Sequence, residues 1–273
     1  MYIAVDIGGT KTLLALFSER GQLLKRLKMK SHQDQDKWLS ELNKFLPRVL
    51  PLRRWAIHAV TFSYPGIIEN GHPGHAPNLP NWNGAEIEQK VKEIFAEKKV
   101  KCKIYYKNDA DLGAFYECYG YIGFSVYLTF GTGIGGGLIK SRRFTKESAS
   151  FEPGHMLKTY KGKRMEWEKI ASSKAIRAAN NDLDVTKISD KKALDDVACR
   201  MSIGIADIIK KYQPDQIILS GPIAEVFPGF KDTLVKLLEA SLPKSYDVPG
   251  IYAAKRPQES VIYGAYLYGR SKK

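Results

Sequence analysis

The chain lacks long apolar runs, a recognisable targeting segment and any large set of cysteines. It contains three cysteines, Cys102, Cys118 and Cys199, and so sparse and odd a set is typical neither of a disulfide framework nor of a zinc module. The apolar runs are far shorter than the roughly 20 residues that a membrane-spanning helix needs. The first residues, MYIAVDIGGT, have none of the features of a signal peptide. We therefore expect a cytoplasmic protein that does not bind a membrane.

Negative charge is scarce relative to positive charge. The 273 residues carry 43 lysines and arginines against 29 aspartates and glutamates, which gives a net charge of +14. The positive residues are dispersed in short groups such as Lys98-Lys99 and Arg142-Arg143. No helix-turn-helix pattern or aromatic RNA-binding motif accompanies them. The charge therefore favours a plain solvated surface, or one that gathers a phosphorylated ligand, over nucleic-acid binding.

The hydrophobic pattern predicts two α/β halves that repeat one plan. In the first half we expect a three-stranded meander followed by helices and strands in alternation, with strands at 2–7, 12–17, 23–30, 56–63 and 101–107 and helices at 36–50 and 84–98. In the second half we expect helices at 109–119, 171–180, 190–212, 228–241 and 259–268, and strands at 124–130, 137–141, 216–221 and 251–255. The long loop at 64–84 is rich in Pro, Gly and Asn, and loops of this length are often functional.

Two glycine-rich turns occupy matching places in the two halves. IAVDIGGTKTLLAL and LTFGTGIGGGLI each place a Gly/Thr turn between two apolar strands. Walker and dinucleotide-binding loops lead into a helix, so both are disfavoured here. Glycines nevertheless let backbone N–H groups converge on an anion. One such hairpin is often only a tight turn, but a pair of them, one from each half, would hold a polyphosphate from two sides. The repeat also indicates an internal duplication.

Two carboxylates stand next to predicted strands. Asp109, in YYKNDADLGAF, lies where a strand meets a helix, so it is either a helix N-cap or a general base. Asp6 follows an apolar strand where burial is expected, and a buried unpaired carboxylate is costly. A shell of magnesium and water, or a role in positioning phosphate, would explain Asp6.

These motifs, in this order, resemble the ROK family of sugar kinases and repressors. The resemblance is carried by IAVDIGGTKTLLAL, KNDADLGAFYE, LTFGTGIGGGLI, EPGH and ILSGPIAE, and it covers essentially the whole chain. The family belongs to the actin/hexokinase/Hsp70 superfold, so the resemblance implies an α/β protein with two similar ribonuclease-H-like lobes around a cleft. We expect the lobes at residues 1–107 and 108–257, with a C-terminal helix at about 258–273 packing back on the first lobe.

The resemblance also implies an activity, namely transfer of the γ-phosphoryl group of ATP to a hexose, with the 6-hydroxyl of glucose as the simplest acceptor. It makes Asp109 the general base and Asp6 the magnesium residue, through water. The implied phosphate and nucleotide contacts are Gly8, Gly9, Thr10, Lys11, Thr132, Gly133 and Gly221. The implied sugar contacts are Gly66, Asn78, Asn108, Glu152, His155 and Glu168, the last at a spacing that differs from the family pattern.

One departure from the family changes the expected cofactors. Many members follow the Gly-His pair with a zinc-binding cysteine cluster, whereas residues 156–167 here read MLKTYKGKRMEW. We therefore expect no zinc. The short link to Glu168 resembles the polyphosphate-using glucokinase branch, so inorganic polyphosphate stays an alternative donor.

Other readings of the family stay open. A sugar-responsive repressor is disfavoured, because the first phosphate hairpin follows a strand that starts at residue 2 and leaves no room for a DNA-binding helix-turn-helix. A non-catalytic sugar sensor is a further alternative. The family also suggests a homodimer, and the pattern does not choose among the hexoses and N-acetylhexosamines.

Overall fold

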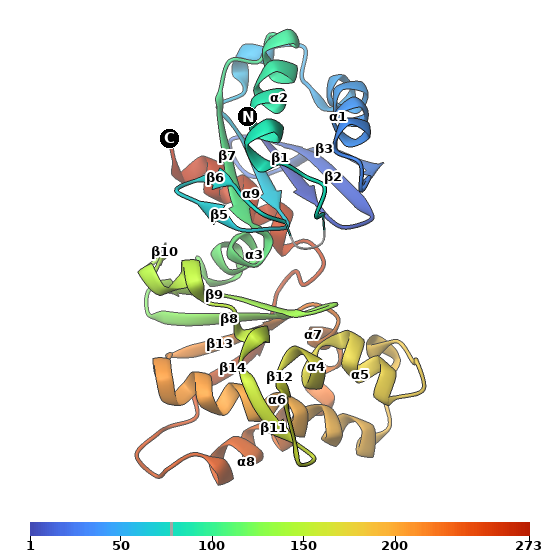
Figure 1. The fold of residues 1–273 in the computed structure, drawn as a ribbon. Coiled ribbons are helices and arrows are strands. Elements are labelled where there is room, and N and C mark those ends of the chain that lie inside the picture. Colours follow the sequence, from blue (N-terminus) through green and yellow to red (C-terminus); the bar gives the residue numbers. More distant parts are fainter. Residues whose placement is uncertain (77–78) are drawn as a thin grey trace. The chain divides into compact units, whose positions relative to one another are not determined.

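The structure is a computed structural model, and it describes residues 1–76 and 79–273. The chain divides into two compact units, residues 1–116 with 259–273 and residues 117–258. Each unit is built on a five-stranded sheet (Figure 1). In each sheet three consecutive strands form an antiparallel meander, and the remaining two strands run parallel to the first strand of that meander.

The first unit has the strand order β3-β2-β1-β4-β7. Its strands are β1 (Tyr2–Ile7), β2 (Lys11–Phe17), β3 (Leu23–Lys30), β4 (Ala59–Tyr64) and β7 (Lys103–Asn108), with the small hairpin β5 (Ile68–Glu69) and β6 (His72–Pro73). Its helices are α1 (Gln35–Val49), α2 (Gly84–Glu97), most of α3 (Asp109–Cys118) and α9 (Ser260–Ser271).

The alternation of side chains along β1 builds two cores in this unit. Ile3, Val5 and Ile7 join one buried cluster with residues of α1 and α2. Tyr2 and Ala4 point to the other face and join residues of α3 and α9. Because successive strand residues face opposite sides, the nearly continuous apolar run of β1 is what a strand covered by helices on both faces requires. The helix of the C-terminal residues thus completes the core of the first unit.

The second unit has the strand order β10-β9-β8-β13-β14. Its sheet contains β8 (Phe124–Phe130), β9 (Ile134–Lys140), β10 (Arg143–Phe144), β13 (Gln216–Ser220) and β14 (Gly250–Ala253), and a separate hairpin contains β11 (Leu157–Tyr160) and β12 (Lys163–Glu166). Its helices are α4 (Glu168–Ala171), α5 (Ser173–Ala179), α6 (Lys191–Tyr212), α7 (Ile223–Val226) and α8 (Lys231–Ser241). Short 3-10 helices occur in the two units at Arg54–Ala56, Lys146–Ser150, Pro153–His155, Val185–Lys187 and Phe227–Gly229.

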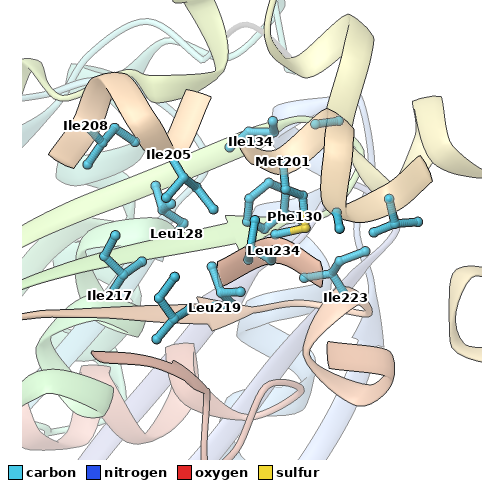
Figure 2. Close-up of a cluster of buried hydrophobic side chains, with 14 of the residues drawn as sticks. Leu128, Phe130, Ile134, Met201, Ile205, Ile208, Ile217, Leu219, Ile223 and Leu234 are labelled. Atoms are coloured by element: carbon cyan, nitrogen blue, oxygen red, sulfur yellow. The ribbon is translucent and has the colours of Figure 1, made fainter. Parts of the chain in front are cut away.

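One buried cluster forms the centre of the second unit. Figure 2 shows Leu128 and Phe130 of β8 and Ile217 and Leu219 of β13 packed against Met201 and other apolar side chains of α6. The sheet is therefore covered by the long helix α6, whose apolar residues recur at helical spacing. No helix in the described parts of the chain is long and apolar enough to cross a membrane.

The β11–β12 hairpin is an element that the hydrophobic pattern did not predict. Its strands pair from Leu157 with Glu166 to Tyr160 with Lys163, which leaves a two-residue turn. Lys161 and Gly162 both have positive φ, 49° and 75°, as the tight turns that suit hairpins require. The turn signal was the Lys-Gly pair, but each strand is too short to show a clear alternation.

Candidate functional site

Polar residues gather where the parallel strands of the first sheet end. Asp6 pairs in register with Ser63 of β4, and Tyr64 of β4 pairs with Asn108 of β7. Asp109 follows directly as the first residue of α3. The carboxyl ends of parallel strands are the usual place for ligands in open α/β sheets. The structure therefore brings the predicted base, the predicted magnesium residue and one predicted sugar ligand to a single edge.

The two carboxyl groups at this edge are electrostatically coupled. Asp6 is partly buried, and Asp109 is an exposed residue. The protein atoms packed around both groups nevertheless remove much of their hydration, and this desolvation is the main cause that raises both pKa values. The pKa of Asp6 rises to about 6, and the charge of Asp109 contributes to that rise. Hydrogen bonding from the backbone N–H of Ala110 partly opposes the rise in the pKa of Asp109.

Asn108 connects this edge to the loop that follows β4. Its Nδ2 donates to the carbonyl oxygen of Gly66 at 3.3 Å, and its Oδ1 accepts from the N–H of Ala110 at 2.9 Å. The loop is held a second time by the hydroxyl of Tyr64, which donates to the carbonyl of Gly74 at 2.9 Å. Asn108 and Gly66 are thus adjacent, whereas Asn78, the other predicted sugar ligand of this loop, lies outside the described residues.

The first glycine turn is a hairpin with an exposed tip. The N–H of Gly8 donates to the carbonyl of Lys11 at 3.1 Å, and Gly9, Thr10 and Lys11 are exposed. A buried polar cluster holds the base of the hairpin: the Thr12 hydroxyl lies 2.8 Å from that of Ser31 and accepts the indole N–H of Trp38 at 2.9 Å. The tip of the turn is therefore accessible, and its base is rigidly attached to β3 and α1.

The second glycine turn is attached to α5. The hydroxyl of Ser173 donates to the carbonyl of Phe130 at 2.6 Å, and the N–H of Lys174 donates to the carbonyl of Gly131 at 3.3 Å. The N–H of Gly131 in turn donates to the carbonyl of Gly133 at 2.9 Å, and Thr132 is exposed at the tip. The first turn of α5 thus fixes the shape of this loop.

A cavity of about 610 Å³ opens beside this second turn. Its lining residues are Gly131, Thr132, Ser173, Lys174, Arg177, Ala178, Asp182, Asp184, Val185 and Pro222. Gly221, the residue before Pro222, has a φ of +80°, and a Cβ there would come within 2.5 Å of the carbonyl oxygen of Phe130. Only glycine fits this position, and the predicted nucleotide glycine directly precedes Pro222, which lines the cavity.

The predicted sugar ligands of the second unit form a second group of polar side chains. Glu152 and His155 bracket a short 3-10 turn, in which the N–H of His155 donates to the carbonyl of Glu152 at 3.2 Å. Glu168 begins α4, and a Cβ built at Gly133 would lie 2.6 Å from its Oε2. The Glu168 carboxylate therefore lies against the second glycine turn.

Glu166 belongs to the same group, although the motif analysis missed it. Its Oε1 lies 3.2 Å from Nδ1 of His155, and its Oε2 pairs with Nζ of Lys169 at 2.9 Å. One potential ligand atom from each of His155, Glu166 and Glu168 lies within 4.8 Å of the others. These side chains are close because the β11–β12 hairpin brings the residues after it back beside His155. The EPGH motif alone could not predict this, because the hairpin itself was not predicted.

Solved structures define the class of fold. An ROK family glucokinase from Streptomyces griseus, in complex with glucose and AMPPNP, has a TM-score of 0.78 with 20% identity and covers 99% of each chain. An inorganic polyphosphate/ATP-glucomannokinase from Arthrobacter has a TM-score of 0.73 with 21% identity, over 100% of this chain and 99% of that one. The chain thus has the two-unit α/β fold of the actin/hexokinase/Hsp70 superfold, and the fold predicted from the motifs is confirmed.

The family follows from the sequence. The profile of the ROK family matches residues 2–271, so the chain belongs to this family, and the predicted resemblance is confirmed. A glucokinase from Thermotoga maritima is 24% identical over 96% of this chain and 95% of its own length. A xylose repressor from Bacillus spizizenii is 25% identical over 71% of this chain and 56% of its own length. Kinases and repressors thus both occur among the relatives.

Proposed function

We propose that the protein is a sugar kinase that transfers the γ-phosphoryl group of ATP to a hydroxyl of a hexose, with the 6-hydroxyl of glucose as the first candidate. The observation that carries this proposal is the position of Asp109. Asp109 is an exposed residue at the carboxyl edge of the first sheet, next to Asn108 and close to Asp6. The family membership and the exposed glycine turn after β1 support the same reaction.

Asp109 supplies the proton acceptor in this proposal. The sugar hydroxyl gives its proton to the carboxylate as its oxygen forms a bond to the γ-phosphorus, and the bond from that phosphorus to the bridging oxygen breaks to release ADP. The raised pKa makes Asp109 a stronger base than an ordinary aspartate. In this proposal the amide of Asn108 contacts the same sugar, and its hydrogen bond to the carbonyl of Gly66 supports that role by holding the amide.

The residues at this edge also fit a magnesium ion. Hard divalent cations prefer carboxylate oxygens, and a cation near Asp6 would offset both the burial and the charge of Asp109, which together raise the pKa of Asp6. Asp6 would hold the ion through water, and the bound ion would neutralise the charge of the donor phosphates. The backbone N–H groups at Gly9 and Thr10, with Lys11, would contact those phosphates, and so would Thr132 and Gly133.

The cavity beside α5 favours ATP over polyphosphate as the donor. Ala178, Val185 and Pro222 supply apolar surface against which a nucleoside would pack. Lys174 supplies positive charge beside Thr132, the charges of Arg177 and Asp182 pair with each other at 3.6 Å, and Asp184 would oppose a long polyanion. Polyphosphate remains the rival donor, because a polyphosphate/ATP kinase is among the structural relatives.

Glu152, His155 and Glu168 are the proposed ligands of the remaining sugar hydroxyls. Carboxylates accept hydrogen bonds, and a histidine ring nitrogen can donate or accept. The closeness of His155 and Glu168 supports their joint role. Asn78 remains a predicted ligand on sequence grounds alone.

The test is detection of hexose phosphate by mass spectrometry. The purified protein is incubated with a panel of hexoses and N-acetylhexosamines, with Mg-ATP and separately with Mg-polyphosphate. We expect product with ATP, and far less of it with Asp109→Asn in the same reaction time. Hexose binding without any product would instead favour the regulator, the class to which the xylose repressor belongs.

A further inference from the structure

The segment between His155 and Glu168 is anchored to one face of α6. Nζ of Lys158 forms an ion pair with Asp207 of α6, and Lys158 is buried. Further along the hairpin, the hydroxyl of Tyr160 donates to Asp196 of α6 at 3.2 Å. Figure 1 shows the β11–β12 hairpin beside this helix. The hairpin, otherwise a pair of short strands, is therefore joined to the longest helix of the unit at two places.

Arg200 of α6 connects the hairpin to α4. Its Nε donates to Asp196 at 2.5 Å, and its guanidinium carbon lies 5.1 Å from the centre of the Tyr160 ring. Its Nη1 donates to the carbonyl of Ile170, in α4, at 3.0 Å. One buried side chain thus contacts the hairpin through Tyr160 and the short helix that starts at Glu168.

The backbone of α6 adds a third attachment at the same place. The indole N–H of Trp167 donates to the carbonyl oxygen of Arg200 at 3.0 Å. The Trp167 ring lies so close to Gly204 that a Cβ there would come within 2.2 Å of it, so glycine is required at position 204. Asp196, Arg200, Gly204 and Asp207 follow one another at intervals of four, four and three residues, which places them on one face of the helix.

The base of the β11–β12 hairpin connects the residues that contact α6 to the two proposed sugar ligands, His155 and Glu168. The N–H of Trp167 donates to the carbonyl of Met156 at 2.8 Å, so the residues that follow His155 and precede Glu168 are hydrogen-bonded to each other. A buried arginine that fails to find partners is costly, and Arg200 makes all its contacts only when Tyr160 and Ile170 are both in place. The arrangement of His155 and Glu168 therefore depends on α6.

We propose that Arg200 is a positioning residue for the sugar site: it holds the segment 156–170 so that His155 and Glu168 face the same hexose. The inference rests on the proposed function for the identity of the ligand. It does not make Arg200 a catalytic residue, because Arg200 acts through Tyr160 and α4. The anchor itself is a property of the fold and can be measured without turnover.

The experiment compares Arg200→Met and Tyr160→Leu with a matched control on the same helix, Lys191→Met, which removes an exposed ion pair with Asp195. Tyr160→Leu keeps the partly buried charge pair of Arg200 and Asp196, so it remains informative if Arg200→Met does not fold. Binding of glucose and of Mg-AMPPNP is measured by calorimetry. We expect the dissociation constant for glucose to rise by roughly 10- to 100-fold, the size of effect that a small misplacement of ligands produces, while that for AMPPNP stays within about twofold of wild type.

Hydrogen exchange of the backbone amides tests separately whether Arg200 holds the segment 156–170 in place. The amides of residues 156–170 should lose protection in both variants, while those of β8 and β13 keep theirs, and Lys191→Met should change neither. Unchanged protection in the segment, or an equal loss of affinity for glucose and AMPPNP, would overturn the inference. If wild-type protein binds no hexose, the proposed function fails instead, and the exchange data still decide whether Arg200 anchors the segment.

Discussion

Burial raises the pKa of Asp6 to about 6, and the charge of Asp109, which lies at the same end of the first sheet, raises it further. Two carboxyls in such a place repel each other when both are ionised. The arrangement costs stability, and carboxyl groups in such places are typical of functional sites. A proton acceptor beside a magnesium residue would be a function of this kind. The two aspartates therefore have different proposed roles although they share one environment.

The sharpest test of the proton acceptor is Asp109→Asn. The amide keeps the shape of the side chain and can still contact a sugar, but it cannot take a proton. We expect kcat to fall by roughly 10²- to 10⁴-fold, the usual size of a general-base contribution, while the dissociation constant for the hexose changes little. Steady-state kinetics and calorimetry measure the two quantities, and wild-type turnover in the variant would remove Asp109 from the mechanism.

The raised pKa of Asp109 leads to a prediction of how kcat/KM depends on pH. Asp109 must be ionised to accept a proton, so kcat/KM should fall as the pH drops through its pKa. Because desolvation raises that pKa, the fall should begin at a higher pH than it would for an ordinary aspartate. A pH profile measured with saturating magnesium checks this. The residual activity of Asp109→Asn should lack the acid limb; if the limb persists there, another group is responsible for it.

The cavity beside α5 offers a test that separates the two donors. Ala178 lines this cavity and is itself exposed, so Ala178→Trp should fill space without disturbing the core. We expect weaker binding of Mg-AMPPNP, by about tenfold or more if the nucleoside loses its apolar contacts, and unchanged binding of glucose.

A control variant and a comparison of the two donors make the Ala178→Trp result interpretable. Lys192→Met removes an exposed charge from α6 and should leave both affinities as they were. If polyphosphate is the true donor, Ala178→Trp should leave turnover with polyphosphate intact, and AMPPNP should bind poorly even to the wild-type protein.

Lys174 tests the charge at the same cavity. Its backbone N–H shapes the second glycine turn, but its exposed side chain is available for the donor phosphates. Lys174→Met keeps the backbone bond and removes the charge. We expect KM for ATP to rise several-fold, with a KM for the hexose that does not change; equal changes in the two would mean that the loop itself has moved. Initial-rate measurements that vary one substrate at a time distinguish these results.

The motifs predicted the fold, and they named a first group of polar residues that the structure brings together, for a physical reason. Glycine turns between apolar strands, and a carboxylate where a strand meets a helix, are local features that the sequence displays directly. Asp6 and Asp109 are 103 positions apart, yet Asp6 lies near the end of β1 and Asp109 directly follows β7. Because these strands are parallel in one sheet, the order of the strands alone places both residues at one edge. The local sequence pattern and the strand order were together sufficient to predict that Asp6 and Asp109 lie near each other.

Glu166 and Arg200 could not be found in this way. The closeness of Glu166 to His155 depends on a two-residue turn at Lys161 and Gly162. Arg200 lies on a helix whose hydrophobic pattern is ordinary, and its importance comes from contacts with Tyr160 and Ile170. Such contacts join segments at 30 to 40 residues' separation and leave no local signal. Residues 156–167, where many family members have a cysteine cluster, are thus attached to α6 by contacts that the sequence pattern does not indicate.

The base of the first glycine turn gives a prediction about stability. The Thr12 hydroxyl is buried and serves both Ser31 and the indole N–H of Trp38. Thr12→Val keeps the volume but leaves Trp38 Nε1 and the Ser31 hydroxyl without that partner. An unsatisfied buried polar group costs about 1–3 kcal/mol, so we expect the free energy of unfolding to fall by about that amount in a urea titration. Thr159→Val, at an exposed position of β11, is the matched control and should change stability by less than about 0.5 kcal/mol. Equal stability of Thr12→Val and wild type would show that the turn does not depend on this hydroxyl.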